Sequence, residues 1–129
     1  MKNRLLFTLP AVIIAVVLFW LSSLTKLPNI DLGFKWSDKA EHLIAYFGYG
    51  LTLVLAVFGN KKDIKFRNGI LKVLIIGGLF GASDEIHQLF VPGRDCDFFD
   101  WVADISGISL SLLFINIIKN LFILRIKKN

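Results

Sequence analysis

Six of the chain's ten acidic residues lie within the twenty-one residues from Asp84 to Asp104. Carboxylates this close together can exchange protons, accept hydrogen bonds from a ligand or hold a hard cation. This stretch connects two long apolar segments, and an ionised side chain inside a bilayer costs about 2.5 to 3.5 kcal/mol. We therefore expect these acids to have polar partners or a function.

Helical spacing predicts which of these acids can meet. Asp84 and Gln88 are four residues apart, with Glu85 next to Asp84, so one end of a helix gathers all three. Asp100 and Asp104 are also four apart on the next apolar segment. Two acidic helix faces are therefore expected.

The turn pair Pro92-Gly93 lies between these two segments. Such a short connection predicts antiparallel neighbouring helices whose acidic faces converge. Arg94 follows the turn and is expected above the acids as a partner for them.

An earlier segment supplies further polar residues at the start of an apolar run. Asp38, Lys39, His42 and Tyr46 recur at spacings that bring them to one end of a helix. Asp38 is also a candidate N-cap, together with Ser37. We expect His42 to belong to the polar site, because an imidazole within an apolar helix needs a partner.

Four apolar stretches position these groups, each near the roughly 20 residues that span a hydrocarbon core. The composition is 55% hydrophobic with a mean hydropathy of +0.65, which is too apolar for an ordinary soluble domain. The sequence predicts an all-α fold, a four-helix transmembrane bundle in a single integral membrane domain covering residues 1–129, with helices at about residues 5–24, 39–58, 68–90 and 100–118.

The first stretch is expected to be a retained helix, because its apolar run is longer than that of a signal peptide and no A-x-A-like cleavage site follows. Pro10 should kink this helix without ending it. Small residues, Gly77 with Gly81 and Ala103 with Gly107 and Ser111, predict close packing between helices.

The basic residues predict the orientation of the bundle, since Lys and Arg are enriched in cytoplasmic loops. Eleven of the fifteen fall on one side: Lys2, Arg4, Lys61, Lys62, Lys65, Arg67, Lys72, Lys119, Arg125, Lys127 and Lys128. Both termini should be cytoplasmic, with the polar site facing outward. Because topology explains the net charge of +5, nucleic acid is not an expected partner.

Asp38-Lys39-x-x-His42-x-x-x-Tyr46, Asp84-Glu85-x-x-Gln88, residues 90–94 and Asp100-x-x-x-Asp104-x-x-Gly107 together resemble the signature of the VanZ-like membrane proteins. The resemblance covers residues 38–113. It implies a bacterial cytoplasmic membrane location and a link to the cell envelope, because family members are similar to a protein associated with low-level resistance to the glycopeptide teicoplanin. It supplies no reaction.

Three functions therefore stay open. The first is binding or modulation of an anionic lipid or cell-wall intermediate through Arg94, Lys39 and His42. The second is an enzyme on a lipid-linked substrate, in which Asp84, Glu85, Asp100 or Asp104 act as acid or base or hold a divalent cation. The third is a small proton-coupled transporter, which would need at least a dimer.

No catalytic residue, metal ligand or oligomeric state is assigned by the sequence, because no nucleophile motif or dedicated metal-ligand signature appears. We expect no cofactor. We lean toward a binding protein over an enzyme. A plainer alternative is that the polar groups only pair with one another and fix the fold.

Overall fold

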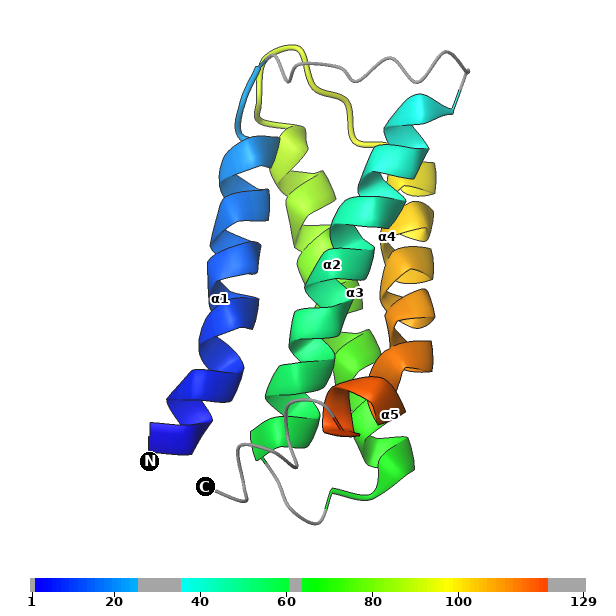
Figure 1. The fold of residues 1–129 in the computed structure, drawn as a ribbon. Coiled ribbons are helices and arrows are strands. Elements are labelled where there is room, and N and C mark those ends of the chain that lie inside the picture. The colour runs from blue at the N-terminus through cyan, green and yellow to red at the C-terminus, as the bar shows by residue number, and fades with distance from the viewer. Residues whose placement is uncertain (1, 26–35, 61–63, 121–129) are drawn as a thin grey trace.

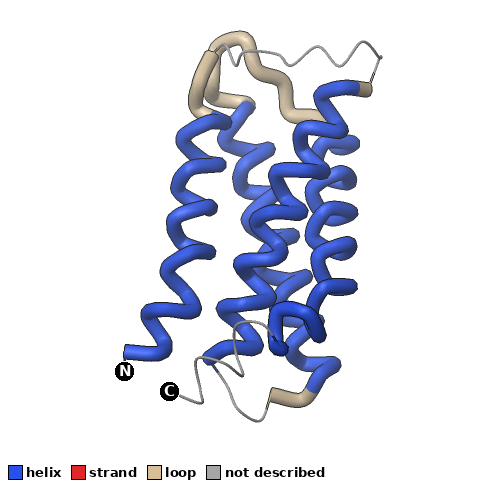
Figure 2. Tube along the Cα trace, in the orientation of Figure 1, coloured by secondary structure: helices blue, strands red, loops and turns tan. Residues whose placement is uncertain are grey.

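A computed structural model of the 129-residue chain describes residues 2–25, 36–60 and 64–120, with side chains from residue 5 onward and without that of Asn60. These residues form helices and no strand (Figure 2). The elements are α1 (Lys2–Ser22), α2 (Ser37–Asn60), α3 (Phe66–Gln88), α4 (Phe98–Ser111), the 3₁₀ turn η1 (Leu112–Phe114) and α5 (Ile115–Ile118).

The four long helices run up and down side by side, so α1 begins and α5 ends at the same end of the bundle (Figure 1). The expected all-α class is therefore confirmed. α1 continues through Pro10. The expected helix starting near residue 100 begins two residues earlier and continues through η1 into α5.

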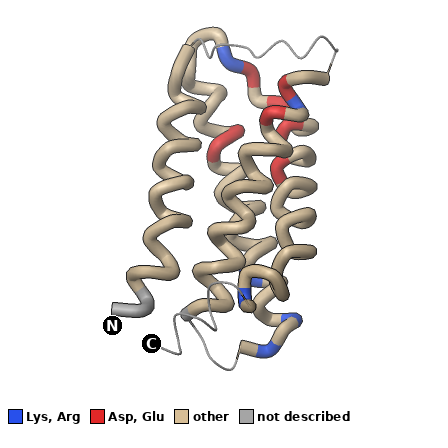
Figure 3. The backbone as a smooth tube through the Cα atoms, viewed as in Figure 1, with Lys and Arg blue, Asp and Glu red and all other residues tan. Residues whose placement is uncertain are grey.

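Three segments are long and apolar enough to cross a membrane: Leu5–Ser22, Ser37–Gly59 and Phe98–Ile118. α3 was expected as a fourth span, but among the described residues it does not reach that apolarity. It carries Arg67 and Lys72 near its start and Asp84 and Glu85 near its end. Its charged ends lie toward the two ends of the bundle, with an apolar middle between them (Figure 3).

The centre of the bundle is an apolar core around α2. Val54 of α2, Val73 of α3 and Ile108 of α4 are all completely buried. α4 approaches α2 closely because Gly107 has no side chain: a Cβ at this position would collide with the backbone of Leu43. The predicted small-residue contact is thus present between α2 and α4.

The link between α3 and α4 contains a tight turn. The amide of Arg94 donates to the carbonyl of Val91 at 3.1 Å, with Pro92 and Gly93 as the central residues. Gly93 has a φ of +80°, which the third position of a type II turn requires and which glycine adopts without strain. The sequence expectation of a turn at Pro92-Gly93 is confirmed.

Candidate functional site

The polar groups gather at the end of the bundle where α2 and α4 begin and α3 ends (Figure 3). This polar end contains four carboxylates that are at least nine-tenths buried: Asp84, Glu85, Asp100 and Asp104. The sequence predicted that these acids would converge, and the structure brings all four into the same region.

His42 of α2 and Asp104 of α4 form the innermost polar pair. The Nδ1 atom of His42 lies 2.9 Å from Oδ1 of Asp104, whose side chain has no solvent exposure. An ionised carboxylate only accepts hydrogen bonds, so when Asp104 is ionised Nδ1 carries the proton and donates it. In the neutral ring this leaves Nε2 as the basic nitrogen, and it lies 3.9 Å from Oδ2 of Asp100.

Asp84 of α3 is held by two hydroxyl groups from other helices. Ser22 of α1 donates to its Oδ1 at 2.6 Å, and Tyr46 of α2 donates to its Oδ2 at 3.3 Å. Both carboxylate oxygens therefore have partners, and the three residues connect α1, α2 and α3. Asp84 is a satisfied structural acid of the polar end, whose contacts explain why it is tolerated there.

Glu85 of α3 is supported on one side only. Its Oε2 accepts a hydrogen bond from the backbone amide of Asp97 at 3.0 Å. Its Oε1 is buried, makes no hydrogen bond with any described residue and lies 3.9 Å from Nδ1 of His42. One oxygen is thus fixed by the α3–α4 link while the other faces the imidazole.

Lys39 of α2 is shared among three carboxylates at the mouth of the polar end. Its Nζ lies 2.9 Å from Asp38, 2.5 Å from Asp97 and 2.8 Å from Asp100. The hydrogen bond from Lys39 holds the pKa of the Asp97 carboxyl below its ordinary value. The Asp97 side chain also accepts from the amide of Phe99 at 2.8 Å, which caps the start of α4.

Arg94 lies in a different place from the one the sequence suggested. Its Nε donates to the carbonyl of Leu24 at 3.1 Å and its Nη2 to that of Leu21 at 3.4 Å. These carbonyls lie at the end of α1 and just beyond it, where the helix dipole favours a cation, and that of Leu21 also accepts from the amide of Leu24. Within the described part of the chain Arg94 makes no ion pair with a carboxylate, so the expected partnership with the acids is replaced by a cap on α1.

The two other predicted residues differ in their surroundings. Gln88 is buried at the end of α3, with 3% of its surface exposed. Asp38 lies in the first turn of α2 and its side chain is 60% exposed. Asp38 therefore marks the outer rim of the polar end and contacts it through Lys39 alone among the described residues.

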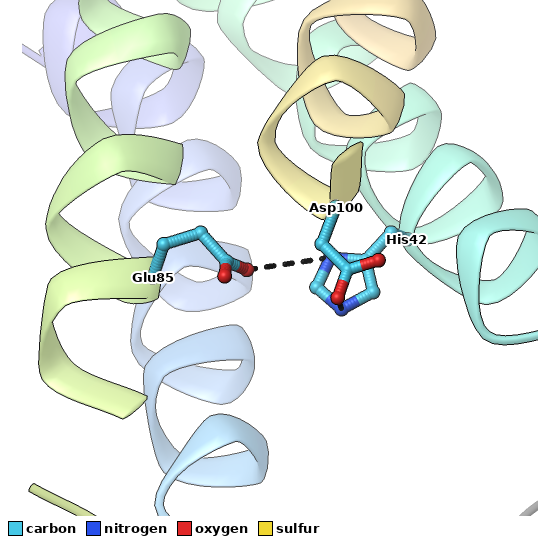
Figure 4. A group of neighbouring side chains, drawn as sticks. All are labelled: His42, Glu85 and Asp100. Atoms are coloured by element: carbon cyan, nitrogen blue, oxygen red, sulfur yellow. Dashed lines mark ion pairs between the residues drawn. The ribbon is translucent and has the colours of Figure 1, made fainter. Parts of the chain in front are cut away.

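Three side chains of the polar end surround a common space: His42, Glu85 and Asp100 (Figure 4). One ligand-type atom from each lies within 4.8 Å of the others. The carboxylates of Glu85 and Asp100 approach the imidazole of His42 from α3 and α4 (Figure 4). A nitrogen and two oxygens in this arrangement could transfer protons or coordinate a metal ion.

Comparison with known proteins places this arrangement in a family. The family model described as VanZ/LLP1 matches residues 5–119. The chain belongs to the VanZ/LLP1 family. The match extends beyond the residues that carried the resemblance in the sequence, and it includes most of α1 together with η1 and α5.

A protein similar to this chain occurs in a fungus. An uncharacterized protein of Schizosaccharomyces pombe is 33% identical to the chain over 78 residues, which is 60% of this chain and 45% of that protein. The chain therefore spans about half the length of the relative it matches. No solved structure matches it significantly.

Sequence reasoning missed three contributions to the polar end of this VanZ/LLP1 protein. Ser22 of α1 binds Asp84, and the neighbouring Ser23 lies 2.9 Å from Nε2 of His87. Trp101 donates from its indole to the carbonyl of Gly78 at 3.0 Å. The serine pair at the end of an apolar run was the available signal for α1, whereas the tryptophan offered none.

Proposed function

We propose that the chain is an integral protein of the bacterial cytoplasmic membrane, a single domain with four spanning helices. Three helices of suitable length and the family membership support this proposal. α3 would cross as a helix sheltered by its neighbours. Large apolar side chains cover the outside of the bundle, among them Val12, Leu79 and Leu113, which are 57%, 67% and 76% exposed. A surface of this kind suits hydrocarbon better than water.

The proposed orientation puts the polar end at the outer leaflet and both termini in the cytoplasm. At the opposite end the described charged residues are all basic: Lys65, Arg67, Lys72 and Lys119 (Figure 3). The positive-inside rule favours the cytoplasm for that end. Tagging each terminus with a reporter that is active on one side of the membrane tests this orientation, and an outward N-terminus would refute it.

The function we propose is binding of an anionic lipid headgroup or a lipid-linked cell-wall intermediate at this polar end. The observation that carries it is the set of four buried carboxylates with His42 at one end of an otherwise apolar bundle. A site of this kind at a membrane surface lies beside lipid headgroups, whose hydroxyl and amine groups can donate hydrogen bonds to carboxylates. An envelope role of this kind fits a family tied to glycopeptide resistance.

An apolar groove on the side of the bundle supports a lipid ligand. It lies between α1 and α3 and reaches Ser23, which bonds to His87 at the level of the polar end. Its lining residues are Ala15, Val16, Phe19, Trp20, Ser23 and Phe80. An acyl chain in this groove would hold its headgroup close to the polar end.

Direct capture of a phosphate by free cations has less support than the sequence suggested. Arg94 is bonded to the carbonyls of α1, and Lys39 is already shared by three carboxylates. The acids outnumber the cations around His42, so a bare phosphate would be repelled. The proposed ligand must therefore bring hydrogen-bond donors or a counter-charge with it.

Native mass spectrometry of the chain, released from nanodiscs containing phosphatidylglycerol and a polyprenyl diphosphate, tests lipid binding. We expect Asp104→Asn to lower bound lipid several-fold, because the His42 imidazole loses its ionic partner. Ser83→Ala is the matched control, since Ser83 is exposed and bonds only to the carbonyl of Phe80 on its own helix among the described residues. Equal lipid binding in both variants would contradict the proposal.

A second candidate is hydrolysis or group transfer on a lipid-linked substrate. The specific observation in its favour is the bond between His42 and Asp104, which fixes the ring and leaves Nε2 as a general base. Turnover of a polyprenyl diphosphate that is lost in His42→Gln would support catalysis, and absence of turnover by the pure chain would exclude this substrate. Transport has less support, because the half of the bundle away from the polar end is an apolar core.

A further inference from the structure

Each of the three side chains around the common space contacts the rest of the protein through one polar atom and has a second polar atom on the side of that space. Glu85 accepts from the Asp97 amide through Oε2, which leaves Oε1 free of described partners. Asp100 approaches Lys39 through Oδ1, which leaves Oδ2 facing His42 at 3.9 Å. His42 is bonded to Asp104 at Nδ1, which leaves Nε2 on the side of Asp100, and Oε1 of Glu85 lies 3.9 Å from the same ring at Nδ1.

The free oxygen of Glu85 is the observation that points to a ligand. The Glu85 side chain is 4% exposed, yet Oε1 makes no hydrogen bond with a described residue. A buried acceptor without a partner costs about 1–3 kcal/mol, and more when it is charged. The placement is therefore better explained by a partner that this space receives.

The outer contacts of the three side chains resemble the supports of metal ligands. A histidine that coordinates a metal usually donates its other N–H to a carboxylate, as His42 does to Asp104. Coordinating carboxylates are in turn hydrogen-bonded or ion-paired, as Glu85 and Asp100 are to the Asp97 amide and to Lys39. These contacts fix the three side chains and do not use Nε2 of His42 or Oε1 of Glu85.

We propose that His42, Glu85 and Asp100 bind a single divalent transition metal ion such as Zn²⁺ or Mn²⁺. One imidazole nitrogen and two carboxylate oxygens suit these ions, whereas Ca²⁺ and Mg²⁺ prefer oxygen ligands alone. Three protein ligands leave at least one coordination position for an exogenous group. The ion also offsets the excess of negative charge at the polar end.

The spacing of the ligand atoms is compatible with a site that closes upon the ion. Atoms about 2.1 Å from a tetrahedral ion lie about 3.4 Å from one another. Here Oδ2 of Asp100 lies 3.9 Å from Nε2 of His42 and Oε1 of Glu85 lies 3.9 Å from Nδ1, while one ligand-type atom of each residue lies within 4.8 Å of the others. Closing these separations by about 0.5 to 1.4 Å, through rotation of the two carboxylates, brings the atoms into range.

The open position has a consequence for the proposed lipid ligand. A phosphate oxygen that is repelled by the carboxylates alone can bind the ion directly. This bridging role rests on the proposed lipid binding, whereas metal binding itself does not. The ion would supply the counter-charge that Arg94 and Lys39 do not provide.

Isothermal titration of the full chain in detergent, stripped with a chelator and without added lipid, tests the metal site. We expect one Zn²⁺ or Mn²⁺ per chain, and at least a tenfold loss of affinity in Glu85→Gln and in Asp100→Asn. Both substitutions keep the shape of the side chain, and circular dichroism reports whether the variants fold. Asp95→Asn is the matched control, because it removes an exposed acid from the same end.

The outcomes separate the two proposals. No metal binding by the wild-type chain, or equal binding by Glu85→Gln, Asp100→Asn and Asp95→Asn, would overturn the metal site. Lipid binding that survives a chelator would then still support the proposed function. Metal binding in a chain that binds neither phosphatidylglycerol nor a polyprenyl diphosphate would support the metal site and contradict that function.

Discussion

Replacing Gly107 with alanine should force α2 and α4 apart. A Cβ at this position would collide with the carbonyl oxygen of Leu43 and lie 2.8 Å from the amide nitrogen of Phe47. Both atoms belong to the backbone of α2, so no change of rotamer can relieve the contact. Restoring an ordinary separation requires these backbones to move apart by about one ångström or more.

The chain supplies a matched control for this substitution. Gly48 lies on α2, and a Cβ there would meet nothing within 4 Å. Alanine in place of glycine stabilises a helix interior by up to about 1 kcal/mol, and this benefit applies to both positions. Overpacking costs about 1–3 kcal/mol. We therefore expect Gly107→Ala to be about 1–3 kcal/mol less stable than Gly48→Ala.

Unfolding in mixed detergent micelles, followed by circular dichroism, measures this difference. The same displacement should weaken the polar end, because His42 precedes Leu43 and Asp104 lies one turn before Gly107. We expect the ring nitrogen signals of His42 to shift in NMR spectra of Gly107→Ala and to stay unchanged in Gly48→Ala. Equal unfolding free energies for the two variants would refute the close backbone contact.

Individual polar contacts should also be measurable. Arg94→Ala should lower the free energy of unfolding by about 1–3 kcal/mol, because the end of α1 loses a charged donor, and leave lipid binding in nanodiscs unchanged. Ser22→Ala should lower the free energy of unfolding by about 1–3 kcal/mol in the wild-type chain and by little in a chain that already carries Asp84→Ala. Additive effects of the two substitutions in this double-mutant cycle would contradict the contact. Trp101→Phe should cost about 1 kcal/mol in the same unfolding assay through loss of one hydrogen bond. The Asp97 carboxyl should titrate below the ordinary pKa of aspartate when followed by NMR, and Lys39→Met should raise that pKa because the hydrogen bond from Lys39 lowers it.

The helices, the turn and the convergence of the acids could be predicted from the sequence because each depends on neighbours in the chain. Asp100 and Asp104 share a face through helical spacing, and Pro92-Gly93 sets the turn between α3 and α4. Local chemistry alone decides such features.

The partners that the α1 end supplies to Arg94 and Asp84 could not be predicted, because they depend on where α1 packs. The sequence of an apolar helix such as α1 does not determine which of its residues lie level with which residues of the neighbouring helices. Nothing in the sequence therefore placed Ser22 beside Asp84 or Leu24 beside Arg94. An arginine near acids was assigned to them by charge alone. The structure shows that it donates instead to two carbonyls at the end of α1 and just beyond it.

The support of Glu85 by the amide of Asp97 has an evolutionary consequence. The donor is a backbone N–H, so every residue except proline at position 97 can supply it. The side chain of Asp97 can therefore change, with loss of the cap on α4 and of the contact with Lys39, while Glu85 keeps its orientation. A substitution other than proline at position 97 therefore leaves the donor to Glu85 in place, whereas an inserted or deleted residue in the α3–α4 link would displace it.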